Sequence, residues 1–359
     1  MKIGILTYHR TLNYGGCLQA FATRVVLESL GHEVYYIDYW PEYHKAYYDI
    51  LSLSKIKYAH GLKTKTKLLI DAFKYGRMSS IRRASFEVFL KEQIYPYCKP
   101  LTESFDIAVY GSDQIWRKQN ALNDYNPMYF GTNIIKAKKH IAYSASMGNL
   151  PANERDKKVV ATLLRNFDKI SVREQQLSDF IEECGIERPI VTLDPTLAVD
   201  KDIWNNIVTK AADYKKYILV YALHNEFNIN SIREYAKTKG LEVKVIYGDV
   251  KKKGADRLIE TVGPYEFLSL IYNANLVFTS SFHGLCFSLI FEKEFFTSFS
   301  TNSDRAKSLL EILGIQDRFL QPHCDCPISF NVIEYKKVNV LLEQKRTESK
   351  LYLSYNCKI

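Results

Sequence analysis

The sequence predicts an α/β protein built from two Rossmann-like units. Strand-like apolar runs alternate with helical patterns along nearly the whole chain, which is typical of helices layered on parallel sheets. A length of 359 residues exceeds what one compact core usually supports, so two domains are expected. The default ligand site of such a pair is a cleft between its two units, which we expect to face each other.

A polar stretch near residues 198–214 separates two series of alternating elements. We therefore predict an N-terminal domain over residues 1–197 and a C-terminal domain over 198–332. Residues 333–359 form a last helix, expected over about 333–350, and a tail, which we expect to pack back on the N-terminal domain. A basic segment at residues 55–90 is expected to be a helical insertion in the N-terminal domain.

The elements follow in order from the apolar patterns. In the N-terminal domain, strands are expected at residues 2–8, 33–39, 106–112, 140–146, 170–174 and 189–195, and helices at 17–30, 154–166 and 174–184. In the C-terminal domain, strands are expected at 216–223, 242–248, 275–280 and 294–300, and helices at 228–239, 264–274, 284–292 and 304–314. Pro264 stands where a first helical turn would begin, which is a favoured place for proline.

Composition and cysteine content indicate a soluble cytoplasmic protein. No apolar run approaches the roughly 20 residues that span a bilayer, and the N-terminus lacks the pattern of a signal peptide. Seven cysteines, an odd number without regular spacing, suit a reducing compartment. His323, Cys324 and Cys326 form one short cluster without a second pair of ligands, so no metal site is expected.

The net charge of +9 is concentrated in one segment. Residues 55–83 contain nine basic side chains and one acid, so this segment alone carries +8. Such a patch can meet anionic lipid, nucleic acid or a phosphorylated substrate, or it can be a solvated helical face. Nucleic acid is not expected as a partner, because the chain lacks aromatic base-stacking platforms and recognition motifs.

The segment TSSFHG, residues 279–284, is the strongest local candidate for a functional site. It joins a predicted strand to a predicted helix, so the amides between Ser281 and Gly284 can form an anion site to which Ser280 also contributes. His283 can donate or accept a proton near neutral pH. The alternative is that His283 caps the helix or packs in the turn.

Two further segments place polar side chains at strand ends. In GSDQIW, Asp113 can act as a general base beside Ser112, or either residue can cap a following helix. In SVRE, Arg173 offers a planar fork that matches carboxylate or phosphate, next to Glu174. The alternative for Arg173 is an ordinary surface arginine, and a direct pair with Glu174 is not expected because adjacent side chains point apart.

Three other turns give weaker signals. NYGG, formed by Asn13, Tyr14, Gly15 and Gly16, lacks the spacing of a dinucleotide fingerprint but permits close backbone approach at a helix start. YSASMG places small residues, including Ser146, at a strand end. LDPT also ends a strand, but Pro195 favours a structural turn there.

Together these segments resemble the polysaccharide pyruvyl transferase family. The resemblance lies in an ordered set of motifs that spans residues 13 to about 290: NYGGCLQAFA, GSDQIW, YSASMG, SVREQQ, LDPTL and TSSFHGLCFSL. It implies a fold similar to the two-domain B-type glycosyltransferases. It also implies transfer of pyruvate from phosphoenolpyruvate to a sugar as a cyclic ketal, with no further cofactor. A B-type glycosyltransferase using a nucleotide sugar is the alternative.

The resemblance also implies roles for individual residues. His283 matches the histidine expected to donate a proton or act on the phosphate, Arg173 matches an arginine expected to hold the donor anion, and Asp113 matches an acid suited to deprotonate the acceptor. Many members carry arginine two positions before the histidine, whereas this chain has Ser281. A neutral hydroxyl weakens an anion contact by roughly 1 kcal/mol. Anion binding must then depend on Arg173, the helix amides, the serine hydroxyls or one of a second group of cations: Arg117, Arg305 and Lys307.

The implied setting is bacterial capsule or exopolysaccharide synthesis. The acceptor sugar is expected on a polyprenyl-diphosphate carrier at the inner face of the membrane. The N-terminal domain would then be the acceptor side and the C-terminal domain the donor side. Lysines near an anionic surface contribute about 1 kcal/mol each, so we expect peripheral membrane association through residues 55–83.

Overall fold

The computed structural model describes residues 1–48, 61–208, 216–223, 226–247, 262–301 and 303–358. The chain divides into two compact units. Unit 1 comprises residues 1–76, 90–199 and 345–359, and unit 2 comprises residues 77–89 and 200–344. Lys55 and Lys57 of the predicted basic segment and the end of the strand predicted at 242–248 lie outside the described residues.

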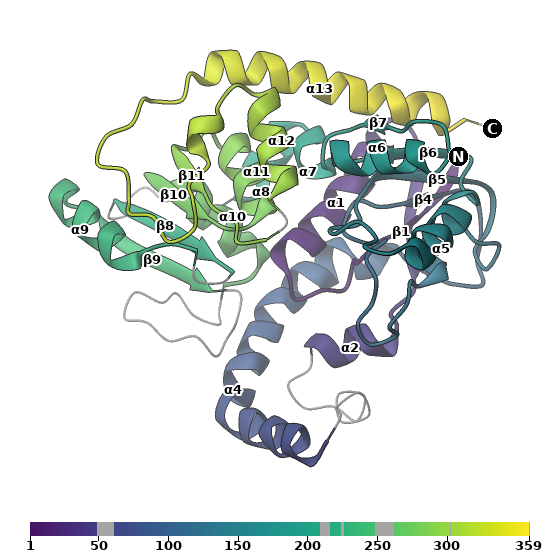
Figure 1. Ribbon diagram of the computed structural model, residues 1–359, viewed down its shortest axis with the longest axis horizontal. Helices are drawn as coiled ribbons and strands as arrows, with labels where there is room; N and C mark the ends of the chain where they lie inside the picture. Colours follow the sequence, from purple (N-terminus) through teal and green to yellow (C-terminus); the bar gives the residue numbers. More distant parts are fainter. Residues whose placement is uncertain (49–60, 209–215, 224–225, 248–261, 302, 359) are drawn as a thin grey trace. The chain divides into compact units, whose positions relative to one another are not determined.

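Unit 1 contains a seven-stranded sheet in the order β3-β2-β1-β4-β5-β6-β7, in which every neighbouring pair is parallel (Figure 1). The strands are β1 (Lys2–Leu6), β2 (Glu33–Asp38), β3 (Cys98–Pro100), β4 (Ser104–Tyr110), β5 (Lys136–Ala145), β6 (Lys169–Val172) and β7 (Ile190–Val191). The predicted α/β class with parallel strands is confirmed. The strand predicted at residues 189–195 pairs over only two residues, because Asp194 already caps the next helix.

The helices of unit 1 connect these strands. They are α1 (Tyr14–Ser29), α2 (Glu42–Tyr48), α5 (Glu154–Leu164), α6 (Gln175–Glu183) and α7 (Pro195–Ala198), with short 3₁₀ turns at Tyr95–Tyr97 and Pro127–Tyr129. Helix α1 is buried along most of its length, which fits its apolar sequence and its central position after β1.

Two long helices contain residues of both units. Helix α4 (Leu62–Gln93) is one continuous helix, where the sequence predicted one or two. Residues 77–89 of α4 belong to unit 2, although the prediction placed the whole 55–90 segment with the N-terminal domain. The reason is local packing, since the Phe89 ring lies 5.1 Å from that of Tyr265. Among the described residues, no helix has the length and apolar character required to cross a membrane.

The second long helix is α13 (Tyr335–Asn356), and its residues from Lys345 onward belong to unit 1. The Ser349 hydroxyl accepts a hydrogen bond from the Leu193 amide at 2.9 Å. The Tyr352 hydroxyl donates to the Ala142 carbonyl at 2.9 Å. These two bonds fix the end of α13 against the sheet of unit 1.

Unit 2 contains a four-stranded parallel sheet in the order β11-β10-β8-β9. The strands are β8 (Tyr217–Ala222), β9 (Glu242–Tyr247), β10 (Leu276–Thr279) and β11 (Phe295–Thr297). The helices are α8 (Lys201–Ile207), α9 (Ile229–Lys239), α10 (Pro264–Asn273), α11 (Phe282–Ile290) and α12 (Asp304–Ile312), with a 3₁₀ turn at Gln316–Arg318. Pro264 is the first residue of α10, as predicted.

Candidate functional site

The carboxyl ends of the unit 1 strands carry a group of polar residues that we call the strand-end cluster. Because the strands are parallel, their carboxyl ends lie at one edge of the sheet. The cluster comprises Ser112 and Asp113 after β4, Ser146 after β5, Arg173 and Glu174 after β6, and Asp194 after β7. The first five of these were predicted from the sequence. The Ser146 hydroxyl donates a hydrogen bond to Glu174, so two predicted residues from different strands are in direct contact.

Arg173 is the centre of this cluster. Its side chain is buried, and Nη1 donates to Asp194 Oδ2 at 2.5 Å. Its Nε also lies 3.9 Å from Glu174 Oε1, a long ion pair, so the expectation that these adjacent side chains do not pair directly is wrong. Burial alone would lower the pKa of Arg173, but the charges of Asp194, Glu174 and Asp113 outweigh it and raise the pKa above its ordinary value.

The charge balance of the cluster is negative. Three carboxylates surround one guanidinium, so the group carries −2 when all four are ionised. A net negative group repels an anionic ligand, whereas its carboxylate oxygens can accept hydrogen bonds from a hydroxyl. The net charge of the strand-end cluster therefore suits a hydroxyl-bearing ligand better than an anion.

Asp113 is half-buried, and its Oδ1 accepts a hydrogen bond from the Gln114 amide at 2.7 Å. The alternative that Ser112 or Asp113 caps a helix is wrong, because residues 111–126 contain no helix. Gly111 holds the turn in place: it has φ +134°, and a Cβ there would lie 2.0 Å from the Tyr143 carbonyl oxygen. The turn thus requires glycine before Ser112 and Asp113.

Gln19 fixes the position of this turn and was missed by the sequence analysis. Its Oε1 accepts from both the amide and the hydroxyl of Ser112, at 3.1 and 3.0 Å. Its Nε2 donates to Thr7 Oγ1 at 2.9 Å and to the Gly16 carbonyl at 2.8 Å. Gln19 is fully buried, so this one amide ties the ends of β1 and β4 to the start of α1. In the sequence, the only local sign of this role was that Gln19 stands about one turn into a helix that follows a strand.

The NYGG turn starts helix α1. Asn13 is the exposed N-cap, and its side chain accepts from the Gly16 amide at 3.2 Å. Tyr14, Gly15 and Gly16 are buried. A Cβ at Gly16 would lie 2.4 Å from Thr11 Oγ1, so close packing explains this glycine. The ligand-binding role predicted for these four residues stays a prediction.

A group of aromatic and histidine residues after β1 and β2 was also missed. The rings of Tyr8 and His44 lie 4.4 Å apart, edge to face. Burial lowers the pKa of His44 to about 4, while Asp113 raises it and Arg117 lowers it. Burial likewise lowers the pKa of His9 to about 4. Both imidazoles are therefore neutral near pH 7, and His44 lies in the electrostatic range of Asp113. The signal in the sequence was LTYHR, directly after the first strand.

In unit 2, the TSSFHG segment follows the central strand β10 as predicted. Ser280 is buried, and its hydroxyl accepts from the Leu223 amide at 2.8 Å, which joins the ends of β8 and β10. His283 lies in the first turn of α11 with 7% of its surface exposed. A Cβ at Gly284 would lie 2.2 Å from Thr279 Oγ1, so glycine is required by packing.

The residue that caps α11 is Ser281, not His283. The Ser281 hydroxyl accepts from the Gly284 amide at 3.4 Å, and the Ser281 amide donates to Thr279 Oγ1 at 3.1 Å. The alternative of a capping role for His283 is therefore wrong. Two of the amides that we expected to face a ligand therefore already have protein acceptors.

A cation does lie beside this turn. The guanidinium carbon of Arg305, at the start of α12, lies 5.2 Å from the centre of the Phe282 ring. Lys307, the other candidate cation from α12, lies over Phe319 instead. Of these two cations, Arg305 is the one that lies next to Phe282, the residue before His283.

His323, Cys324 and Cys326 do not combine with other ligands. Among the described residues, no group of three or more His, Cys, Asp or Glu side chains is arranged to hold a metal ion. The three residues lie in the turn that follows the 3₁₀ segment Gln316–Arg318, and the His323 amide donates to the Glu226 carbonyl.

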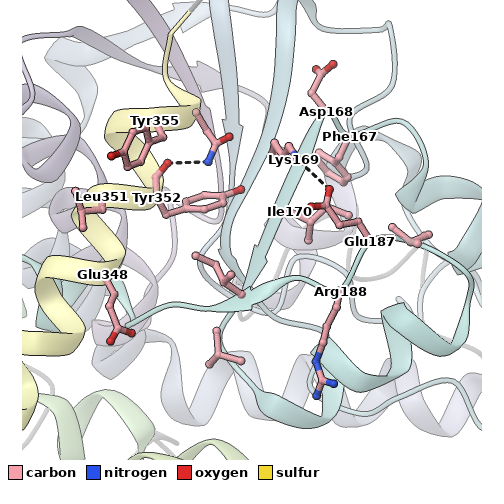
Figure 2. Close-up of a pocket in the computed structure, with 14 residues that line it drawn as sticks. Phe167, Asp168, Lys169, Ile170, Glu187, Arg188, Glu348, Leu351, Tyr352 and Tyr355 are labelled. Carbon is pink, nitrogen blue, oxygen red and sulfur yellow. Dashed lines mark hydrogen bonds and ion pairs between the residues drawn. The ribbon is translucent and has the colours of Figure 1, made fainter.

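A cavity of about 630 Å³ lies elsewhere in unit 1, between β6, β7 and the end of α13 (Figure 2). Lys169 and Ile170, the first residues of β6, line it, whereas Arg173 follows the last residue of the same strand. Lys169 and Glu187 form an ion pair of 2.7 Å at this cavity, which Figure 2 shows as a dashed line. None of the predicted site residues lines the cavity, so it is separate from the strand-end cluster.

The fold is that of an α/β protein with ionisable side chains at the carboxyl ends of parallel strands, where ligands bind in open α/β sheets. The chain belongs to the polysaccharide pyruvyl transferase family, because the sequence profile of that family matches residues 13–303. This range contains the strand-end cluster and the NYGG and TSSFHG segments and ends before Arg305, and the resemblance predicted from the motifs is confirmed. The family makes the protein a transferase of polysaccharide biosynthesis.

Solved structures with similar folds were also found. A putative UDP-N-acetylglucosamine 2-epimerase from Listeria monocytogenes is 11% identical with a TM-score of 0.46, covering 99% of this chain and 91% of that one. The UDP-GlcNAc 2-epimerase of Methanocaldococcus jannaschii is 14% identical with a TM-score of 0.42, covering 98% and 94%. A heptosyltransferase of Escherichia coli is 11% identical with a TM-score of 0.41, covering 96% and 100%. Similarity at this level supports no conclusion about chemistry. No match to a curated protein sequence was found.

Proposed function

We propose that this protein transfers the pyruvyl group of phosphoenolpyruvate to a sugar and forms a cyclic ketal. The methylene carbon of phosphoenolpyruvate gains a proton, and the central carbon becomes an oxocarbenium-like electrophile. A sugar hydroxyl attacks that carbon and loses its proton to a base. Inorganic phosphate leaves with its bonding electron pair, and a second hydroxyl of the same sugar closes the ketal. The two hydroxyl protons are thus divided between the new methyl group and the phosphate.

The observation that carries this proposal is the membership of the family together with the negative strand-end cluster. Asp113 is the group that we assign as the base for the acceptor hydroxyl. It is half-buried and follows a turn held by Gln19. The charges of Asp113 and the buried Glu174 both raise the pKa of Arg173. A carboxylate within hydrogen-bond reach of a hydroxyl can take up its proton, which is the role that we assign to Asp113.

On the donor side we assign His283 as the group that protonates the methylene carbon or acts at the phosphate. Its position in the first turn of α11 places it close to the positive end of the helix dipole, where an anion is favoured. Arg305, beside Phe282, is the cation that we propose in place of the arginine that many family members carry at the position of Ser281.

Arg173 was predicted to hold the donor anion, and this role stays a prediction. Its ion pair with Asp194 and the net charge of −2 of the whole cluster favour a structural role instead. We propose that Arg173 is mainly a positioning residue that holds the carboxylates of the strand-end cluster together. A single guanidinium that already neutralises Asp194 has less attraction left for a dianion.

The acceptor that we propose is a sugar on a polyprenyl-diphosphate carrier, modified during capsule or exopolysaccharide synthesis. The buried aromatic and neutral histidine side chains after β1 and β2 are the kind of groups that contact sugar rings and hydroxyls. We also propose that the protein works in the cytoplasm, peripherally at the inner face of the membrane, through the basic residues of segment 55–83.

Ligand-induced thermal stabilisation distinguishes this function from that of a nucleotide-sugar glycosyltransferase. Phosphoenolpyruvate alone is expected to raise the melting temperature, because a ligand that binds only the folded state stabilises it. Arg305→Ala is expected to weaken this effect about tenfold in ligand concentration. Lys307→Ala, three residues from the start of the same helix, is the matched control and keeps the wild-type response. Stabilisation by a nucleotide sugar and not by phosphoenolpyruvate would contradict the proposal.

A further inference from the structure

The first half of helix α4, residues 62–76, exposes large apolar side chains. Leu69 is 54% exposed, Ile70 is 62% exposed and Phe73 is 97% exposed. These three residues lie within a little more than one turn of the helix. Singly exposed apolar side chains are ordinary, but three neighbouring ones on a single helix usually mark an interaction surface.

Helical spacing brings these apolar residues to one face. Leu69 and Phe73 are four positions apart and Ile70 and Phe73 are three apart, so their side chains are neighbours on the helix surface. Four exposed lysines lie on the same segment: Lys63, Lys65, Lys67 and Lys74. At 100° per residue, Lys63, Lys67 and Lys74 border one side of the apolar stripe and Lys65 borders the other. We call this set of seven residues the α4 face.

The opposite face of the same segment is different. Leu68, Ala72 and Tyr75 are half-buried, so this side of the helix is covered in part by the protein itself. The exposed side is therefore a defined surface of α4, with an apolar centre and a basic border on both sides.

We propose that the α4 face lies in the interface of an anionic membrane, with Leu69, Ile70 and Phe73 inserted at the boundary of headgroups and acyl chains. Helices that combine an apolar stripe with flanking lysines bind membranes in this orientation, parallel to the surface. The long lysine side chains can reach the headgroups while their stems cover apolar surface. The helix does not cross the bilayer, since none among the described residues is long and apolar enough.

The charge of the α4 face selects this occupant over a second copy of the chain. A second copy would bring another four lysines against the first four, which is repulsive, whereas anionic headgroups complement them. The inference extends the proposed function, because it gives a way for the protein to reach a lipid-linked sugar. The inference rests on the proposed function only for the purpose of the membrane contact. The contact itself is measured without any substrate.

Binding of the full-length protein to vesicles tests the inference. Vesicles of phosphatidylglycerol and phosphatidylcholine are expected to bind the protein, and vesicles of phosphatidylcholine alone to bind it at least tenfold more weakly. Leu69, Ile70 and Phe73 changed together to Ala should weaken binding about 100-fold. Lys63, Lys65, Lys67 and Lys74 changed together to Gln should weaken it by about 600-fold, since each lysine contributes about fivefold.

Matched controls come from exposed positions elsewhere in the chain. Ile328, which is 87% exposed, is changed to Ala as the apolar control. Lysines of unit 2 are changed together to Gln as the charge control: Lys237, Lys239, Lys336 and Lys337. Both controls are expected to bind vesicles as the wild type does. Insertion is measured separately with Phe73→Trp, whose fluorescence should shift to shorter wavelength and be quenched by lipid-borne quenchers.

Three results would overturn the inference. Equal vesicle binding by the apolar triple variant and the wild type would exclude insertion of these side chains. Insertion would also be excluded if vesicles left the fluorescence of the Phe73→Trp variant unchanged. A wild type that sediments as a dimer while the triple variant is monomeric would assign the face to a second copy. Pyruvyl transfer to a water-soluble sugar is measured in parallel, so that a wild type that transfers pyruvate but does not bind anionic vesicles refutes only the membrane contact.

Discussion

Arg173 and Asp194 form a buried ion pair at the carboxyl ends of β6 and β7, with Nη1 and Oδ2 2.5 Å apart. The same carboxylate holds the start of α7, since Asp194 Oδ1 accepts from the amide and hydroxyl of Thr196 at 3.0 and 2.6 Å. The pair therefore connects a predicted site residue to a structural turn that the sequence analysis had treated separately.

Removal of one partner of this pair should destabilise the protein strongly. Arg173→Met leaves Asp194 as a buried charge without its main partner, and breaking such a pair costs about 3–5 kcal/mol. Urea denaturation measures the loss. The double variant Arg173→Met with Asp194→Leu should recover most of it, because no charge is then left alone. If Arg173→Met is as stable as the wild type, the ion pair does not contribute to the free energy of unfolding.

Asp113→Asn tests the assignment of the base. Asparagine keeps the size of the side chain but cannot take up a proton, so the turnover number should fall by about 10²–10⁴. Asp113 is half-buried and not part of the Arg173–Asp194 pair, so the melting temperature should change little. Phosphate release is the readout, and Asp124→Asn, at an exposed position, is the control. A variant with full turnover would exclude Asp113 as the base.

His283→Gln tests the donor side of the proposal. Glutamine retains hydrogen bonding but cannot transfer a proton, so turnover should fall by about 10²–10⁴ while phosphoenolpyruvate still stabilises the protein. His323→Gln removes an exposed histidine of unit 2 and serves as the control. If turnover in His283→Gln equals that of the control, the histidine has no part in proton transfer.

Acid should destabilise the protein through His9 and His44. Burial holds the pKa of each at about 4, below the ordinary 6.5 of the unfolded chain. The unfolded state therefore binds more protons between these values. The stabilising contribution is complete above pH 6.5 and falls as the pH drops toward 4, by up to about 3 kcal/mol per histidine.

Urea denaturation between pH 7.5 and 4.5 checks this dependence. His44→Gln removes one of the two groups, so the free energy of unfolding should fall less steeply with acid than in the wild type. His44 is 7% exposed, so its replacement also changes packing, and the slope rather than the absolute stability is compared. Identical slopes would contradict the prediction.

The order and type of most helices and strands could be predicted from the sequence alone. Apolar strands with glycine or polar residues at their ends, such as IAVY before Gly111, mark a buried parallel strand and its functional end without any tertiary information. The end of the helix predicted at residues 333–350 was underestimated, since α13 continues to Asn356. Its last turns contact the sheet of unit 1 through Tyr352, a partner more than 200 positions away that local periodicity does not contain.

The candidate site was predicted residue by residue but not as a set of contacts. Ser112 and Asp113 were found because they follow a strand, whereas Gln19 was missed because its bond to Ser112 spans 93 positions. Asp194 was correctly associated with a turn, but its pairing with Arg173 depends on the adjacency of β6 and β7. Long-range hydrogen bonds and ion pairs of this kind require the sheet order, which a single sequence does not specify.

The central claim is the transfer of a pyruvyl group from phosphoenolpyruvate to a sugar, and mass spectrometry of the acceptor tests it most directly. The full-length protein is incubated with phosphoenolpyruvate and a lipid-linked galactose-type acceptor, and released phosphate is measured in the same sample. The account predicts that the acceptor gains the mass of one pyruvate ketal, with one phosphate released per ketal formed. An unchanged acceptor with phosphoenolpyruvate, or a gain of a whole sugar from a nucleotide sugar, would contradict it.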